Sequence, residues 1–147
     1  MPVNGRNIYK NNRALTNLSQ EAYAERIGVS PAQIYRYETG VNVPPDDVVM
    51  SMAELSGDLT LPYRHMLETS GAARMMFPDI QKLPLPQATV QLLLAIREVA
   101  DGQAILLQLA ADGEITEDEA PDWEVVIKNL DAVIKAAVQV KFAEGVG

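Results

Sequence analysis

Residues 18–40 contain two short helical patterns, each opened by a serine and separated from the other by a glycine. Ser19 precedes the first amphipathic run, and its side-chain oxygen can accept a hydrogen bond from a free backbone N–H of the first turn. Gly28 stands where the chain must leave this helix, because glycine adopts a positive φ without a steric penalty. The stretch therefore predicts two short helices joined by a tight turn. The residues expected to face inward are Ala22, Ala24, Ile27, Val29, Ile34 and Tyr37.

The second helix of this pair has a complete set of start and stop signals. Ser30 is its expected N-cap, and Pro31 at the first helical position loses no needed hydrogen bond. Gln33, three residues after the cap, completes a capping box. Gly40 ends the helix, and Pro44 and Pro45 prevent its continuation. Its outward positions are Ala32, Gln33, Tyr35 and Arg36.

This stretch resembles the Cro/repressor (Xre-type) helix-turn-helix family, and the resemblance covers roughly residues 6–68. The matching positions are Leu18, Ser19, Gln20, Glu21, Ala24, Ile27, Gly28, Val29, Ser30, Ile34, Glu38 and Gly40, with Arg13, Leu15, Pro44 and Ala53 fitting the flanks. The resemblance implies a five-helix, lambda-repressor-like DNA-binding domain in residues 1–69. Its third helix, about Pro31–Thr39, would enter the major groove of double-stranded DNA.

The resemblance also assigns roles by position. Gln20 would bind a DNA phosphate, and Ser30 would combine capping with a phosphate contact. Arg13 and Glu38 match a pair that forms a largely internal salt bridge, with a structural role. The base-facing positions would be Pro31, Ala32, Gln33 and Arg36. Because proline and alanine carry no side-chain donors, readout would depend on Arg36, which suits guanine, and Gln33, which suits adenine.

Each of these side chains also has a plainer interpretation. Gln33 can serve only as a cap of its own helix, and Arg36 can be a solvated surface arginine. Tyr35 can pack against the fourth helix or touch a sugar-phosphate, and the sequence does not choose between the two. The other tyrosines of this half are interpreted as core residues instead of stacking platforms: Tyr9, Tyr23 and Tyr37.

The charge of the chain is unusual for a protein that binds DNA. The formal net charge is −8, and the pI is about 4.6. Counting charged residues gives −1 for residues 1–64 and −7 for residues 65–147. Because the first half is only near neutral, non-specific attraction to phosphate should be modest. A dimer would compensate by doubling the contacts.

The second half predicts a long helical hairpin. Residues 70–86 contain a glycine and three prolines and are expected to form a linker or an ordered strap. Residues 87–147 follow as the hairpin. A helix from Gln87 to about Ala111 is apolar on nearly all sides, and such a helix must be covered on several faces. A last helix opens at Pro121 and ends near Gly145.

This aliphatic surface predicts a symmetric dimer in which two hairpins form a four-helix bundle. The residues assigned to dimerisation are Leu92, Leu93, Ile96, Val99, Leu106, Trp123, Val126, Leu130, Val133 and Ala137. The plainer interpretation is that the hairpin packs onto its own N-terminal domain. The alanine-aspartate-glycine segment at 111–113, before an acidic turn, also resembles the tails of phage-like Xre-type regulators of Gram-positive bacteria.

The sequence offers little for catalysis or for a metal. It contains no cysteine, and His65 is its single histidine. The acidic turn after Asp112 imitates the end of a calcium loop, but Gln108 and Ala110 stand where carboxylates should be. We therefore expect no enzymatic activity, no metal and no cofactor. There is no apolar signal segment and no candidate membrane span, so a cytoplasmic protein is expected.

The sequence as a whole predicts an all-α, sequence-specific transcriptional regulator. We expect a dimeric repressor of phage or mobile-element type that reads an inverted-repeat operator. The alternative is an antitoxin-like or adaptor protein whose C-terminal helices bind a partner protein. A stable dimer would favour the first hypothesis, and a monomer with exposed apolar helices the second.

Overall fold

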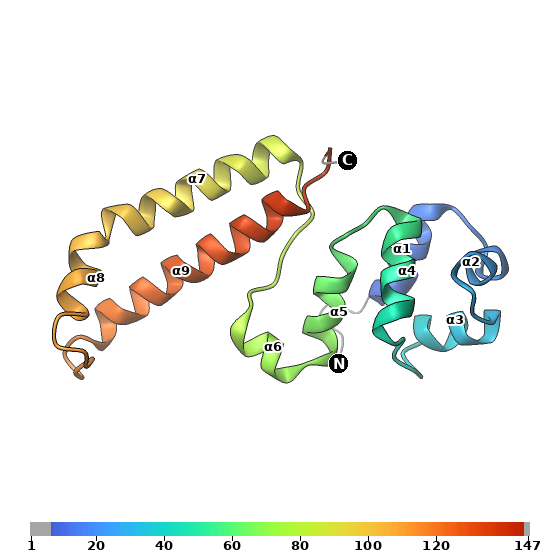
Figure 1. The fold of residues 1–147 in the computed structure, drawn as a ribbon, viewed down its shortest axis with the longest axis horizontal. Helices are drawn as coiled ribbons and strands as arrows, with labels where there is room; N and C mark the ends of the chain where they lie inside the picture. Colours follow the sequence, from blue (N-terminus) through green and yellow to red (C-terminus); the bar gives the residue numbers. More distant parts are fainter. Residues whose placement is uncertain (1–6, 146–147) are drawn as a thin grey trace. The chain divides into compact units, whose positions relative to one another are not determined.

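The computed structural model describes residues 7–145, and all regular structure in that range is helical, as predicted (Figure 1). The chain divides into two compact units, one ending at Met76 and the other beginning at Phe77. The first unit contains six helices within the described residues. They are α1 (Ile8–Thr16), α2 (Gln20–Ile27), α3 (Pro31–Glu38), α4 (Asp46–Ser56), α5 (Leu61–Thr69) and α6 (Gly71–Met76).

The core of the first unit lies between α1, α2, α3, α4 and the start of α5. Three tyrosines predicted as core residues are buried in it, Tyr9, Tyr23 and Tyr37. The other buried members are aliphatic or small: Ala24, Ile34, Val49, Met52, Ala53 and Leu61. Partly buried side chains around them include Ile27 and Val29, which were expected to face inward. Burial of this apolar surface is the main force that holds the short helices together.

The stretch expected as a linker or an ordered strap, residues 70–86, contains the helix α6 near its start. The Ser70 side chain accepts a hydrogen bond from the Ala73 N–H at 3.1 Å and so opens α6. The Arg74 guanidinium donates to the Leu67 carbonyl at 2.7 Å, which joins α6 to the end of α5. After α6, residues 77–84 of this stretch have irregular backbone, and they belong to the second unit.

The second unit is an antiparallel pair of long helices (Figure 1). α7 (Leu85–Asp101) lies along α9 (Ala120–Lys141), and α8 (Gln103–Leu109) bends away from the end of α7. The single helix expected from Gln87 to Ala111 is therefore interrupted. Gly102 forms the break, with φ −87° and ψ 5°, because glycine has a low helix propensity and terminates the ladder easily.

Within the second unit, the irregular segment 77–84 packs against α7, α9 and the residues that follow α9. Leu83 is buried with Ala88 and Ala143, and the Glu144 N–H donates to the Leu83 carbonyl at 2.9 Å. The Gln81 N–H donates to the side chain of Gln139 at 3.0 Å. This segment is called the strap below. The last helix was expected to reach about Gly145, but it ends at Lys141, and the backbone after it pairs with the strap.

Candidate nucleic-acid interface

The two helices α2 and α3 are fixed by local caps. The Ser19 side chain accepts from the Ala22 N–H at 3.2 Å, and Gly28 closes α2 with φ +85°. The Ser30 side chain accepts from the Gln33 N–H at 3.2 Å and opens α3. At the other end, the Val41 N–H donates to the Arg36 carbonyl at 2.9 Å after Gly40 turns the chain with φ +75°. Both ends of α3 are therefore held by hydrogen bonds of its own neighbourhood.

The helix α3 buries one face and exposes the other. Ile34 and Tyr37 lie in the core, where they fix the rotation of the helix about its axis. The five residues expected at the base-facing or sugar-facing positions are exposed: Pro31, Ala32, Gln33, Tyr35 and Arg36. In the part of the chain that the structure describes, no ion pair engages the guanidinium of Arg36. This face is therefore available to another molecule.

Gln33 forms the capping box that the sequence predicts. Its side-chain oxygen accepts from the Ser30 backbone N–H at 2.9 Å and from the Ser30 hydroxyl at 3.2 Å. A bidentate contact with adenine uses both the oxygen and the nitrogen of a carboxamide. Because the oxygen of Gln33 is already engaged in the cap, adenine readout by Gln33 requires the capping box to open.

The cap can be tested through stability. We expect Gln33→Ala to lower the free energy of unfolding by about 0.5–1 kcal/mol, because it removes one half of a capping box. Gln33→Glu should stay within about 0.5 kcal/mol of the original protein, since a glutamate at the same position retains the acceptor and suits the helix dipole. Urea denaturation of both variants measures the difference. Equal losses in the two variants would contradict a capping role.

A polar network ties α3 to α1 and α2. Arg13 and Glu38 form an ion pair through two hydrogen bonds, Nε to Oε1 and Nη2 to Oε2, the latter at 3.1 Å. The Arg13 Nη1 atom donates to the Leu18 carbonyl at 2.9 Å, just before α2. The hydrogen bond to Glu38 is the main cause that raises the pKa of Arg13. The pair therefore joins three segments of the first unit.

Gln20 extends this network toward the surface. Its side-chain amide donates to Glu38 Oε2 at 2.7 Å. The resemblance assigned Gln20 to a phosphate contact, and an amide group has two N–H donors. One donor can hold Glu38 while the other remains for a phosphate. Glu38 thereby orients the side chain of Gln20.

Sequence reasoning missed Asn7. Its side chain caps α1 by accepting from the Tyr9 and Lys10 N–H groups, and its amide donates to the Tyr37 carbonyl at 2.6 Å. This second bond fixes the last turn of α3 to the start of α1. An asparagine directly before an amphipathic run is a capping signal, but the contact with residue 37 depends on the tertiary fold.

Residues 10–61 match a family model described as helix-turn-helix, of the Cro/C1 type. The match covers just over a third of the chain and contains α2 and α3 with the helices that support them. The chain carries an N-terminal helix-turn-helix domain. No match was found among curated proteins or among solved structures. The match supports a DNA-binding regulator, since this family consists of such proteins.

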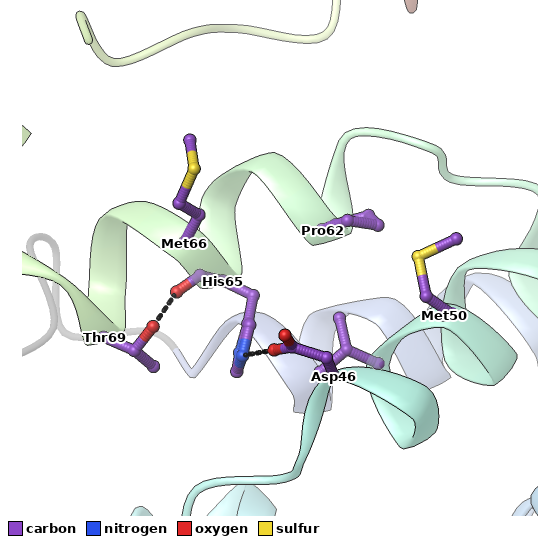
Figure 2. Close-up of a pocket in the computed structure, with 7 residues that line it drawn as sticks. Asp46, Met50, Pro62, His65, Met66 and Thr69 are labelled. Carbon is purple, nitrogen blue, oxygen red and sulfur yellow. Dashed lines mark hydrogen bonds and ion pairs between the residues drawn. The ribbon is translucent and has the colours of Figure 1, made fainter. Parts of the chain in front are cut away.

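The first unit also contains a buried histidine, His65, beside a surface depression (Figure 2). His65 Nδ1 lies 2.8 Å from the Tyr9 hydroxyl, and Nε2 lies 3.2 Å from Asp46 Oδ1. An imidazole with its proton on Nε2 accepts from the tyrosine and donates to the aspartate. The depression, of about 460 Å³, is lined mostly by apolar side chains of α4 and α5. His65 thus joins α1, α4 and α5.

We expect His65 to bind no metal, and this stays a prediction. In residues 7–145, no group of three or more histidine, cysteine or acidic side chains lies close enough to hold a metal ion. Both ring nitrogens of His65 already have partners within the domain. Residues 7–145 also contain no helix that combines the length and the hydropathy needed to cross a bilayer.

The environment of Tyr9 predicts a loss of stability in alkali. Burial, with a smaller contribution from Glu68, raises the pKa of Tyr9 to about 12 from an ordinary value of 10. Between these values the unfolded chain loses a proton that the folded chain keeps. The free energy of unfolding should therefore fall from about pH 10 upward, by at most about 1.4 kcal/mol per pH unit for this one group.

Urea denaturation at pH 8, 10 and 11 measures this slope. We expect Tyr9→Phe to reduce it, because the variant has no hydroxyl to ionise at that position. Tyr35→Phe is the matched control, because it removes the hydroxyl of an exposed tyrosine, and only the difference between the two variants is assigned to Tyr9. An equal slope for Tyr9→Phe and the original protein would contradict the raised pKa of Tyr9 as a cause of the loss of stability. Burial raises the pKa of Tyr23 as well, so part of the slope should persist.

The residues assigned to dimerisation fall into three groups in the second unit. Val126 is buried inside the hairpin, and so is unavailable to a partner. The half-buried members are Leu92, Val99, Leu106, Trp123, Val133 and Ala137. The exposed members are Leu93, Ile96 and Leu130. Part of the surface that the sequence assigned to dimerisation therefore serves instead to close the hairpin between α7 and α9.

Proposed function

We propose that this protein is a sequence-specific transcriptional regulator, and specifically a dimeric repressor of phage or mobile-element type that acts in the cytoplasm without enzymatic activity. The observation that carries the proposal is the exposed face of α3 on a helix whose ends and rotation are fixed. A helix that is ordered before binding loses little conformational entropy on entering a DNA groove. Such a helix can present the same side chains to successive base pairs.

The proposed contacts divide into positioning and readout. Gln20 and Ser30 lie at the starts of α2 and α3, where backbone N–H groups and the helix dipole also favour a phosphate. Arg36 supplies the main base contact, a bidentate hydrogen bond to guanine. Pro31 and Ala32 offer only apolar contact, which suits a thymine methyl group. The site would therefore be read mainly through one arginine in each half-site.

The dimer follows from the same argument. A single reading helix with one strong base contact provides little specificity, and two copies related by a two-fold axis double it. The operator would be an inverted repeat whose half-sites lie about 34 Å apart, or a multiple of that distance. The near-neutral charge of residues 1–64 supports a site that depends on specific contacts more than on phosphate attraction.

Selection of bound fragments from a random pool of duplex DNA tests this function. We expect an enriched inverted repeat with a guanine at equivalent positions of both halves. Fluorescence titration should then give tighter binding to the enriched sequence than to a scrambled one at the same salt concentration. Equal affinity for both sequences would refute sequence-specific regulation.

A second candidate function comes from the apolar surface of α7, α8 and α9. Exposed aliphatic side chains occur on all three helices, including Val90, Leu94, Ile105, Leu107 and Val125. Larger apolar patches commonly mark protein interaction sites. An antitoxin-like or adaptor protein would use this surface for a different protein. Light scattering on the purified full chain separates the two, since the repressor requires a dimer without any added partner.

A further inference from the structure

The two flanks of the helical hairpin differ in what covers them. On one flank, the Gln139 amide donates to Gln91 at 3.0 Å across α7 and α9. The strap adds the bond from the Gln81 N–H to Gln139, and Gln139 and Ala136 are buried. This side, called the strap flank, is closed over part of its length by the chain itself.

The opposite flank has no such cover from the strap. At 100° per residue, Leu93 and Ile96 lie about 160° and 140° around α7 from Gln91. On α9, three residues lie at least about 120° around the helix from Gln139: Ile127, Leu130 and Ile134. Because Gln91 and Gln139 contact each other on one side of the hairpin, these five residues share the other side. Leu93, Ile96, Ile127, Leu130 and Ile134 are called the free flank, and all five are exposed.

The composition of the free flank indicates an apolar partner. Its members recur at spacings of three and four residues on α9, the spacing of a helix-packing stripe. All five are leucine or isoleucine, and their side chains contain no group that can form a hydrogen bond with a polar partner. Water contact with such a stripe is unfavourable in proportion to its apolar area. A second apolar helix layer would remove this contact.

We infer that the free flank is the surface on which a second copy of this chain docks, with α7 of one subunit opposite α9 of the other. The inference rests on the dimer of the proposed function and specifies its interface. A two-fold axis parallel to the helices produces this arrangement and makes every neighbouring pair of helices antiparallel, as in a four-helix bundle.

The charges at the outer edge of the hairpin favour this arrangement. Because α7 and α9 are antiparallel and Gln91 contacts Gln139, Arg97 is about level with residue 133. A two-fold axis parallel to the helices keeps this level in the partner. It therefore brings Arg97 near the level of the partner's Asp131, and these two side chains carry opposite charges. Within one subunit Arg97 lies 3.9 Å from Asp101 in an exposed ion pair, so the contact with the partner's Asp131 would add a second carboxylate to the same guanidinium.

Two adjacent leucines provide the test. Leu93 on the free flank is 61% exposed, and Leu94 on the strap flank is 58% exposed. Leu93→Glu places a charge in the proposed interface of both subunits and should raise the dissociation constant of the dimer by about 100-fold or more. Leu94→Glu should leave it within about threefold. Sedimentation equilibrium on the full-length protein measures both, and circular dichroism checks that helix content is kept.

A second pair of variants guards against an indirect effect of Leu93→Glu. Ile134→Glu on the free flank should dissociate the dimer, and Val125→Glu, which is on the other side of α9, should not. Arg97→Glu and Asp131→Arg should each weaken the dimer by about 2- to 5-fold, and the double variant should recover the loss.

Each result has a distinct meaning. The opposite pattern is dissociation by Leu94→Glu and Val125→Glu but not by Leu93→Glu and Ile134→Glu. It would overturn the choice of flank and leave the proposed dimeric regulator intact. Dissociation by all four variants, or by none of them, also overturns the assignment of the interface to the free flank. A monomeric original protein at tens of micromolar overturns both this interface and the dimer of the proposed function. Charge variants without recovery would overturn the placement of α7 opposite α9.

Discussion

Replacing Arg13 by alanine should lower the free energy of unfolding by about 3–5 kcal/mol. The Glu38 side chain is only 4% exposed, and Arg13 supplies two of the three hydrogen bonds that its carboxylate accepts from side chains of the described residues. Without the guanidinium, the buried carboxylate of Glu38 retains one of these three side-chain hydrogen bonds, the one from the neutral amide of Gln20. The Leu18 carbonyl also loses its hydrogen bond from Arg13. Urea denaturation at pH 7, monitored by circular dichroism, measures the change.

A double variant separates the ion pair from the packing around it. Arg13→Met combined with Glu38→Leu removes both charges and keeps apolar volume, and such replacements are often close to neutral. We expect the double variant to be more stable than Arg13→Met alone, with a coupling free energy of about 1–3 kcal/mol. If the effects of the two single substitutions simply add, the pair contributes no coupling, and its proposed role in holding α3 to α1 is wrong.

Replacing Arg36 by alanine should weaken binding to the selected operator by about 1–3 kcal/mol, or roughly 5- to 150-fold for each guanine that the arginine no longer binds. The guanidinium lies on the exposed face of α3 and has no ion pair among residues 7–145. Its removal should therefore leave the free energy of unfolding within about 0.5 kcal/mol. The weaker binding should also be confined to operators with guanine at the contacted position.

Arg36→Lys is the matched control for this prediction. Lysine keeps the positive charge but cannot form the planar fork that binds the two acceptors of guanine. We expect it to recover binding to scrambled DNA and to recover little of the specific affinity. Fluorescence titrations at two salt concentrations separate the two terms. If lysine restores the full preference for the operator, Arg36 contributes charge alone, and direct readout by its guanidinium is excluded.

The helix-turn-helix domain was predictable because its signals are local. Ser30, Pro31 and Gln33 specify the start of α3 within four residues, and Gly28 and Gly40 provide the positive φ that ends a helix. The amphipathic spacing of Ile34 and Tyr37 then selects the buried face. Each of these signals acts over one or two helical turns, so it can be read without the rest of the fold.

The second half was predictable in class but not in detail. Its apolar spacing correctly indicated helices, but Gly102 divided one expected helix into α7 and α8. Glycine inside an apolar pattern is compatible both with a continuous helix and with a break, and packing decides between them. The same limit applies to Ser70, which opens α6 within a stretch that its prolines indicated to be irregular.

The sequence by itself determined that the chain is helical, where α2 and α3 begin and end, and which side chains of α3 face outward. Only the tertiary structure decided that Gln20 binds Glu38, that Asn7 holds the last turn of α3, and that Leu93 and Leu94 lie on different flanks of the hairpin. Caps and periodicity depend on residues within a turn or two of each other. Coverage of a flank instead depends on the strap, which reaches Gln139 from 58 residues away along the chain.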